Sequence, residues 1–301
     1  MIKIGVVGCG HLGQFHIKLL KDSKKFVLVG FIDTDDVKSS IIEEQYEVQR
    51  FKNLNNLSNV IDAVVIATPT TSHYTIAKYF LEQKKHVFIE KPITSSIEEA
   101  EELILLANKF ELVGQVGHIE RFNSAYTNVK NILKPMFIEA HRLSNYPQRG
   151  TDVSVVLDLM IHDIDIILSI IDSPIKSINA NGTKVVSVSP DIVNARIEFK
   201  NKCVANLTAS RISLKKMRKM RLFQRDSYIS IDFDKGSSEQ VKIVDYDKTN
   251  KYALTLKDSD GKLKEIKITN YKNQNLNAIV EEHNNFYNCL LYTSPSPRDR
   301  Q

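Results

Sequence analysis

Hydrophobic residues in the first 120 positions fall into short uninterrupted runs, separated by stretches in which they return every three or four residues. The apolar runs are 2–7, 25–32, 63–67, 86–89 and 111–117, and the helical stretches between them are 11–20, 37–46, 72–83 and 97–109. This alternation predicts a parallel sheet covered by helices on both faces. Right-handed crossovers then place the carboxyl ends of the strands along one rim, where such sheets bind ligands.

The pattern changes after about Phe122. It predicts a helix over 124–133, a strand over 136–142, a long helix over 152–171 and the start of a last helix over 276–287. Between the last two helices it predicts strands at 193–199, 203–210, 218–223, 228–233, 240–246, 252–257 and 264–268, with hairpin turns at Asn201-Lys202 and Asp260-Gly261. The expected fold class is therefore α/β: a doubly wound parallel sheet in a domain over 1–120, then an α+β domain over 121–288 with a mostly antiparallel sheet.

The last residues, Cys289 to Gln301, read CLLYTSPSPRDRQ. The stretch through Asp299 resembles the translation of a transposase adapter used for sequencing libraries, and a genuine disordered tail is the alternative. We expect 289–301 not to be native and the natural chain to continue beyond about 288.

A glycine turn follows the first apolar run. In Gly8-Cys9-Gly10-His11-Leu12-Gly13, Gly8 permits the turn, Gly10 lets the backbone approach a pyrophosphate, and Gly13 lets helix and strand pack closely. The helix that begins at His11 offers amide groups and a positive dipole end to phosphates. A strand before the turn and a helix after it predict a dinucleotide-binding Rossmann domain.

Asp33 ends the second strand, twenty residues after the glycine turn. A carboxylate there accepts hydrogen bonds from a ribose 2′-hydroxyl and repels a 2′-phosphate. Asp35 and Asp36 add negative charge, and no arginine follows within the turn. The predicted cofactor is therefore NAD rather than NADP. A helix N-cap formed by Asp33 or Asp35 is a compatible alternative.

Composition excludes some classes of protein. No apolar run has membrane-spanning length and the chain begins with a strand, so we expect a cytoplasmic protein without a membrane partner. The cysteines Cys9, Cys203 and Cys289 lack C-x-x-C spacing, so neither disulfides nor zinc are expected. The net charge of +5 is concentrated in 215–221. Without interleaved aromatic residues this run favours a solvated strand edge or an oligomer rim over nucleic acid, and it also suits a phosphorylated or nucleotide-linked substrate.

Glu90-Lys91-Pro92 follows the fourth strand on the predicted ligand rim. Pro92 restricts Lys91 to extended backbone, and an ammonium group there can stabilise the oxyanion that develops on a substrate hydroxyl. The alternative is a surface lysine before a turn. Thr68-Pro69 lies on the same rim, and His73 opens the next helix, where it either caps that helix or touches the cofactor.

The long predicted helix is apolar nearly all round, so its polar residues need partners. Asp158 and His162 stand at i and i+4, where Asp158 can hold the tautomer of a His162 that faces the substrate. A satisfied core pair and two metal ligands are alternatives, but no third ligand has suitable spacing. Asp163 is expected to be a helix-surface charge. The polar positions form one stripe that should line a wet cleft: Ser154, Asp158, His162, Asp165 and Ser169.

Together these motifs resemble the Gfo/Idh/MocA oxidoreductases over residues 1 to about 288. The resemblance implies a second domain with a large open sheet, dimers or tetramers formed through that sheet, and a catalytic site of Lys91, Asp158 and His162. The predicted cofactor-binding residues are Gly8, Gly10, His11, Leu12, Gly13, Asp33, Thr68, Pro69, His73 and Glu90.

Segments 117–123 and 156–165 resemble the branch of this family that contains UDP-N-acetylglucosamine 3-dehydrogenases. This implies oxidation of the 3-hydroxyl of a UDP-N-acetylhexosamine for lipid A synthesis, with Lys91, Arg121 and His162 near the substrate. Ser124 replaces the usual proline, and the helix with which the family returns to the first domain is expected to be missing. An inositol, a free aldose or a non-catalytic NAD-binding regulator are the alternatives; the three catalytic residues argue against the regulator.

Overall fold

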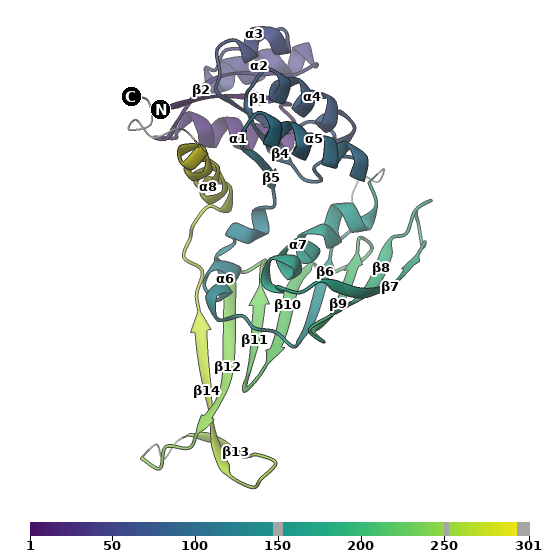
Figure 1. Ribbon diagram of the computed structural model, residues 1–301, viewed down its shortest axis with the longest axis vertical. Coiled ribbons are helices and arrows are strands. Elements are labelled where there is room, and N and C mark those ends of the chain that lie inside the picture. Colours follow the sequence, from purple (N-terminus) through teal and green to yellow (C-terminus); the bar gives the residue numbers. More distant parts are fainter. Residues whose placement is uncertain (147–152, 250–252, 294–301) are drawn as a thin grey trace. The chain divides into compact units, whose positions relative to one another are not determined.

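The computed structural model describes residues 1–146, 153–249 and 253–293 (Figure 1). The chain divides into two compact units. The first contains Met1–Ile119 and the chain from Asn277 onward, and the second contains Glu120–Leu276. The division therefore lies one residue from the predicted boundary, but the last helix belongs to the first unit and not, as expected from the sequence, to the second.

The first unit is a five-stranded parallel sheet with the order β2-β1-β3-β4-β5. α1, α2 and α8 cover one face, and α3, α4 and α5 cover the other. The doubly wound fold is confirmed. Its elements are β1 Ile2–Val7, α1 His11–Lys21, β2 Phe26–Ile32, α2 Asp36–Tyr46, α3 Leu54–Ser58, β3 Ala63–Ile66, α4 Thr70–Glu82, β4 His86–Glu90, α5 Ile97–Lys109, β5 Gly114–Gly117 and α8 Ala278–Thr293.

The strand order places a switch point between β1 and β3. The chain passes from β1 to β2 on one side and then crosses to β3 on the other. At such a point neighbouring connections leave in opposite directions, and a crevice opens beyond the carboxyl ends of the strands. The glycine turn after β1 and Thr68 after β3 therefore lie where this fold binds ligands.

The second unit is built on a nine-stranded sheet with the order β13-β14-β12-β11-β10-β6-β9-β8-β7. Only the β6–β9 pair is parallel among its described pairings, so the mostly antiparallel sheet is confirmed. Its elements are η1 Ile119–Phe122, α6 Ser124–Thr127, η2 Lys130–Ile132, β6 Phe137–Leu143, η3 Val156–Met160, α7 Ile161–Ile170, β7 Ile175–Thr183, β8 Ile192–Phe199, β9 Val204–Ser210, β10 Met217–Gln224, β11 Ser227–Asp232, β12 Ser237–Asp245, β13 Leu254–Lys257 and β14 Leu263–Tyr271.

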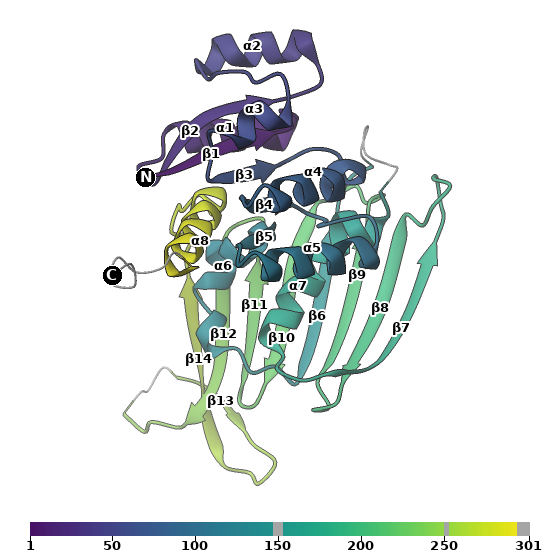
Figure 2. The ribbon, with the colours of Figure 1, turned by 45° about the horizontal axis from the view of Figure 1, so that its top comes forward.

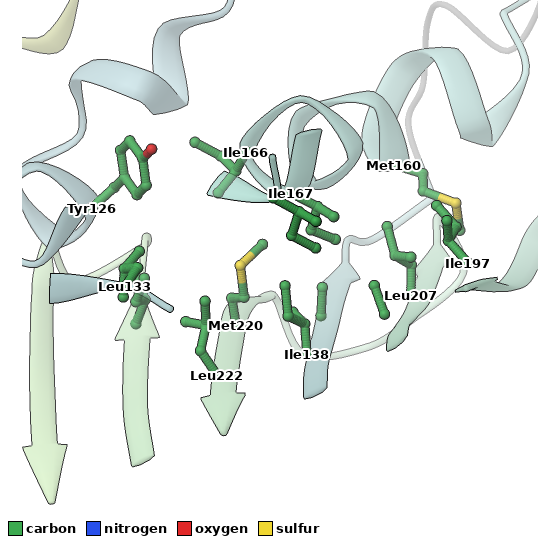
Figure 3. Close-up of a cluster of buried hydrophobic side chains, with 14 of the residues drawn as sticks. Tyr126, Leu133, Ile138, Met160, Ile166, Ile167, Ile197, Leu207, Met220 and Leu222 are labelled. Carbon is green, nitrogen blue, oxygen red and sulfur yellow. The ribbon is translucent and has the colours of Figure 1, made fainter. Parts of the chain in front are cut away.

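Helix α7 lies across one face of this sheet (Figure 1 and Figure 2). Figure 3 shows Ile167 of α7 directed at Met220 and Ile138 of the central strands and Ile166 on the side of Tyr126, all of them buried. Burying each such side chain contributes about 1.5–3 kcal/mol. Strand β7 was not predicted because nearly all its residues are exposed, so it carries no alternation of apolar and polar positions.

Two expectations about the second unit are wrong. The basic run 215–221 does not form a strand edge, because β10 lies between β11 and β6 and its Met220 and Leu222 are buried in the core. The expectation of one continuous α-helix over 152–171 is also wrong. Its described part contains a π-helical turn, η3, before α7 begins at Ile161.

The structure also differs from what the sequence predicted for the end of the chain. Helix α8 includes 289–293, and Leu290 is buried in the core of the first unit. A helix that returns to the first unit is therefore present in this chain, contrary to the expectation. Residues 294–301 of the predicted tail lie outside the described residues. No helix in the described part of the chain has both the length and the apolar character needed to span a membrane.

Candidate active site

The glycine turn brings three backbone segments close together. Gly8 has φ of +92°, and a Cβ built on it would lie 2.6 Å from the carbonyl oxygen of Ala67, just after β3. A Cβ on Gly13 would lie 1.9 Å from the carbonyl oxygen of Gly8. Both positions therefore exclude any side chain, and the first turn of α1 packs directly on the loop.

The same turn fits a pyrophosphate. Gly10 is the N-cap of α1 and supplies no side-chain cap, so no side chain of the cap competes for the amide groups of His11 and Leu12. A Cβ on Gly10 would meet nothing within 4 Å. The backbone is thus open at Gly10 and donor-rich at the helix N-terminus, which is the arrangement that holds an anionic bridge between two phosphates.

We expect Gly13→Ala to disrupt the loop and lower the melting temperature, because its new methyl group overlaps the Gly8 carbonyl. Gly10→Ala meets open space and should leave the melting temperature unchanged, but it should raise the Kd for NADH about tenfold or more because the methyl group blocks the close approach. Thermal denaturation and NADH fluorescence titration measure both effects. Equal Kd values for Gly10→Ala and the unaltered enzyme would contradict the assigned role of Gly10.

Asp33 connects the end of β2 to the glycine turn. Its Oδ2 accepts a hydrogen bond from the Cys9 amide at 2.5 Å, and its Oδ1 accepts one from the Asp35 amide at 3.0 Å. The N-cap of α2 is Asp35, whose side chain accepts from the Lys38 amide at 3.0 Å. Burial raises the pKa of the Cys9 thiol to about 12, so this thiol stays protonated and is not a nucleophile.

One cation near this turn was missed in the sequence. Arg50 forms an isolated parallel bridge with Phe31 of β2, and its guanidinium donates to the carboxylate of Asp36. That hydrogen bond lowers the pKa of Asp36. The prediction of NAD over NADP considered only the residues directly after Asp33. The fold brings Arg50, from a later segment, next to β2 and Asp36.

His73 bridges two loops on the ligand rim. It is buried, and its Nε2 lies 2.8 Å from the Thr68 carbonyl oxygen while its Nδ1 lies 2.8 Å from the Pro92 carbonyl oxygen. Helix α4 begins after Pro69 without a side-chain cap, so His73 does not cap it. His73 instead joins the Thr68-Pro69 turn to the segment that carries Lys91.

Glu90 is the last residue of β4, and Lys91 follows it. Glu90 is buried; its Oε2 accepts from the Lys91 amide at 3.2 Å, and its Oε1 lies 2.9 Å from Nε2 of His16. Both carboxylate oxygens thus contact protein groups, and direct cofactor binding by Glu90 remains a prediction. The side chain of Glu90 thus holds the backbone amide of Lys91, and His16 in turn contacts Glu90.

Asp158 and His162 belong to the second unit and are half-buried. Asp158 lies in the π-helical turn η3, and His162 is the second residue of α7. Their i, i+4 relation therefore spans a junction between two helix types and not a uniform α-helical face. Single π-helical turns within α-helices are frequent at functional sites. That Asp158 and His162 lie close to Lys91 remains a prediction.

The other half of the predicted polar stripe has partners within the second unit. Asp165 accepts two hydrogen bonds of 2.7 Å from Arg121, and Ser169 shares one of 3.1 Å with the Tyr126 hydroxyl. These positions therefore contact η1 and α6, and the lining of a wet cleft by the stripe remains a prediction. The predicted contact of Arg121 with substrate remains a prediction.

The expectation that Asp163 is a surface charge is wrong. Asp163 is 3% exposed and accepts hydrogen bonds from Arg142 of β6 at 2.9 and 3.2 Å. A third hydrogen bond from the Arg142 guanidinium reaches Glu120 at 2.9 Å. Burial raises the pKa of Asp163, although the Arg142 guanidinium lowers it. This buried triad holds α7, next to His162, on β6 and η1.

A signal for this triad exists in the sequence. Residues alternate along β6 between the core and the open face, and Arg142 falls on the core side together with Ile138 and Ala140. An arginine at such a position requires buried acidic partners. The sequence does not say which acids these are.

The doubly wound sheet, a glycine turn suited to pyrophosphate and a second unit with an open antiparallel sheet define a dinucleotide-binding oxidoreductase. Residues 2–118 match the family described as "Oxidoreductase family, NAD-binding Rossmann fold", and residues 112–239 match the "GFO/IDH/MocA C-terminal domain". The chain belongs to the Gfo/Idh/MocA family. It is an NAD-dependent dehydrogenase that acts on CH–OH groups.

Similar proteins include several sugar and polyol dehydrogenases. A UDP-N-acetylglucosamine 3-dehydrogenase of Acidithiobacillus ferrooxidans is 35% identical over 234 residues, which are 77% of this chain and 74% of the relative. A solved structure of an enzyme with that name from the same organism has a TM-score of 0.86 at 29% identity, covering 98% of this chain and 90% of the other. A scyllo-inositol 2-dehydrogenase (NAD(+)) of Bacillus subtilis is 27% identical over 70% of this chain and 68% of its own.

Proposed function

We propose that this enzyme oxidises the 3-hydroxyl of a UDP-N-acetylhexosamine with NAD. The observation that carries the proposal is the 35% identity to a UDP-N-acetylglucosamine 3-dehydrogenase, which exceeds the 27% identity to the inositol dehydrogenase. The same similarity supports a cytoplasmic enzyme that serves lipid A synthesis. The resemblance of the chain to its family supports a homodimer or homotetramer formed through the nine-stranded sheet.

The proposed chemistry divides between the two units. Bound NAD would accept the hydride from the carbon that carries the hydroxyl. His162, oriented by Asp158, accepts the hydroxyl proton as a general base. The Lys91 ammonium stabilises the oxyanion character that develops on the same oxygen. The proposal thus requires Lys91 of the first unit and His162 of the second to reach one hydroxyl group.

The choice of NAD over NADP rests on Asp33. Its carboxylate is held in place by the amide groups of Cys9 and Asp35. A carboxylate in this position repels a 2′-phosphate. Arg50 is paired with Asp36, so its charge is partly neutralised by a partner within the protein.

A substrate panel tests the proposal. We expect NADH absorbance to rise with UDP-N-acetylglucosamine or UDP-N-acetylgalactosamine, and to rise at least about a hundredfold more slowly with free N-acetylglucosamine, since the nucleotide supplies binding energy remote from the reacting carbon. NADP should support a much lower kcat/KM than NAD. A preference for an inositol or a free aldose would replace the proposed substrate, and comparable kcat/KM values with NADP would overturn the cofactor assignment.

The similarity to a scyllo-inositol 2-dehydrogenase makes a cyclic polyol the second candidate substrate. A polyol carries neither pyrophosphate nor uracil, so adding UDP separates the two candidates. UDP should compete with a UDP-sugar and leave the oxidation of an inositol unaffected.

A further inference from the structure

A chain of three buried side chains connects the C-terminal helix to the segment that carries Lys91. Nε2 of His283, in α8, lies 2.8 Å from Nδ1 of His16 in α1, and Nε2 of His16 lies 2.9 Å from Oε1 of Glu90. His16 is fully buried, and His283 and Glu90 are 5% and 8% exposed. The other carboxylate oxygen of Glu90 accepts from the amide of Lys91. All four residues belong to the first unit.

The chemistry of the groups sets the direction of the hydrogen bonds. A carboxylate only accepts, so His16 presents a protonated Nε2 to Glu90. With the Nε2 proton of His16 directed at Glu90, we assign Nδ1 of His16 as the acceptor and Nε2 of His283 as the donor. Burial lowers the pKa of His283 to about 3, so His283 is neutral.

Neighbouring groups restrict the movement of these three side chains. The ring of Phe88 contacts His16 edge-on, with the ring centroids 5.4 Å apart, and Phe286 packs on Phe88. A Cβ on Gly117 would lie 2.9 Å from Oε2 of Glu90, so the backbone of β5 confines the carboxylate. Apolar surroundings strengthen hydrogen bonds and raise the cost of leaving one unmade.

Helix α8 is also held in register with the sheet. Gln115 of β5 donates to the Glu282 carbonyl oxygen at 3.2 Å and accepts from the Asn285 side chain at 2.9 Å. His283 lies between these two positions of α8. The contacts on both sides of His283 fix its imidazole beside Phe88 of β4, with the ring centroids 6.1 Å apart.

We propose that His283 and His16 are positioning residues, through which α8 holds Glu90 and thereby the backbone of Lys91 in the orientation that catalysis requires. The inference rests on the proposed role of Lys91. It makes the C-terminal helix a part of the active-site scaffold as well as a cover for the sheet.

Three variants of α8 test this proposal. His283→Leu removes the donor to His16 and should lower kcat about tenfold or more with the Kd for NADH within about twofold, because misplacement affects the reacting group more than cofactor binding. His283→Gln retains a side-chain N–H and should restore kcat to within about twofold. Phe286→Leu is the matched control; it opens a cavity on the same helix and lowers the melting temperature, but it keeps the hydrogen bonds and should keep kcat.

The outcomes separate positioning from packing. Equal losses of kcat in His283→Leu and Phe286→Leu, or a wild-type kcat in His283→Leu, would overturn the proposal. Nitrogen-15 NMR of histidine-labelled, unaltered enzyme needs no substrate and no variant: it should show His16 protonated at Nε2 only, and the opposite tautomer would also overturn it. A Lys91→Met variant with full kcat in the same assay would instead refute the proposed function. The NMR result would then still show whether the hydrogen bonds from His283 through His16 to Glu90 are present.

Discussion

Lys91→Met should lower kcat by about two to four orders of magnitude. Methionine retains the length and much of the packing of lysine but supplies no charge to the oxyanion that forms during oxidation. The melting temperature and the Kd for NADH should stay close to those of the unaltered enzyme, because the glycine turn and Asp33 are unchanged. Steady-state kinetics with the substrate found in the panel, and NADH titration of the same preparation, measure the effect.

Lys109→Met is the matched control for this prediction. Lys109 is the last residue of α5 and is exposed. The same substitution there removes a charge from the same unit without touching the ligand rim. A Lys91→Met enzyme that turns over as fast as Lys109→Met would end the assignment of Lys91 to catalysis.

Arg142→Met should be the most destabilising single change in the second unit. It leaves Glu120 and Asp163 buried without their cation, and breaking a buried pair in this way costs about 3–5 kcal/mol. A domain of this size loses about 2–4 °C of melting temperature per kcal/mol, so we expect a fall of about 10 °C. Thermal denaturation followed by circular dichroism measures it.

Arg221→Met is the control for the lost ion pair. Arg221 pairs with Glu139 on the open face of the same sheet, with 47% of its side chain exposed. An exposed pair contributes about 0–1 kcal/mol, so this variant should melt within a few degrees of the unaltered protein. Adding Asp163→Asn to Arg142→Met should recover part of the loss, since one uncompensated carboxylate is removed. Equal melting temperatures for the two arginine variants would show that the buried triad does not stabilise the unit.

Much of the architecture was predictable because it depends on interactions between neighbours in sequence. The apolar run before Gly8 and the helix after it were predicted correctly, as were most of the strands of both sheets. Period-two and period-3.6 patterns report which side of a segment is buried, whatever it is buried against. Strand β7 shows the limit of this rule, because an exposed edge strand has no buried side to report.

The sequence also indicated most residues that shape the cofactor turn. Glycine positions follow from backbone sterics, so the roles of Gly8 and Gly13 could be predicted from their spacing and their neighbours. Buried polar pairs follow a different rule. Asp163 was expected on the surface because nothing near it in the chain shows that Arg142 arrives from β6 to meet it.

By itself, then, the sequence determined the order of most strands and helices, the glycine turn and the family. Each of these is written in residues a few positions apart, where local backbone geometry and hydrophobic periodicity act. Only the tertiary structure decided which buried polar groups meet: His16 and His283 are 267 positions apart, and His16 and Glu90 are 74 apart. A buried polar group must find a partner, but the partner's identity depends on which distant segments the fold brings into contact.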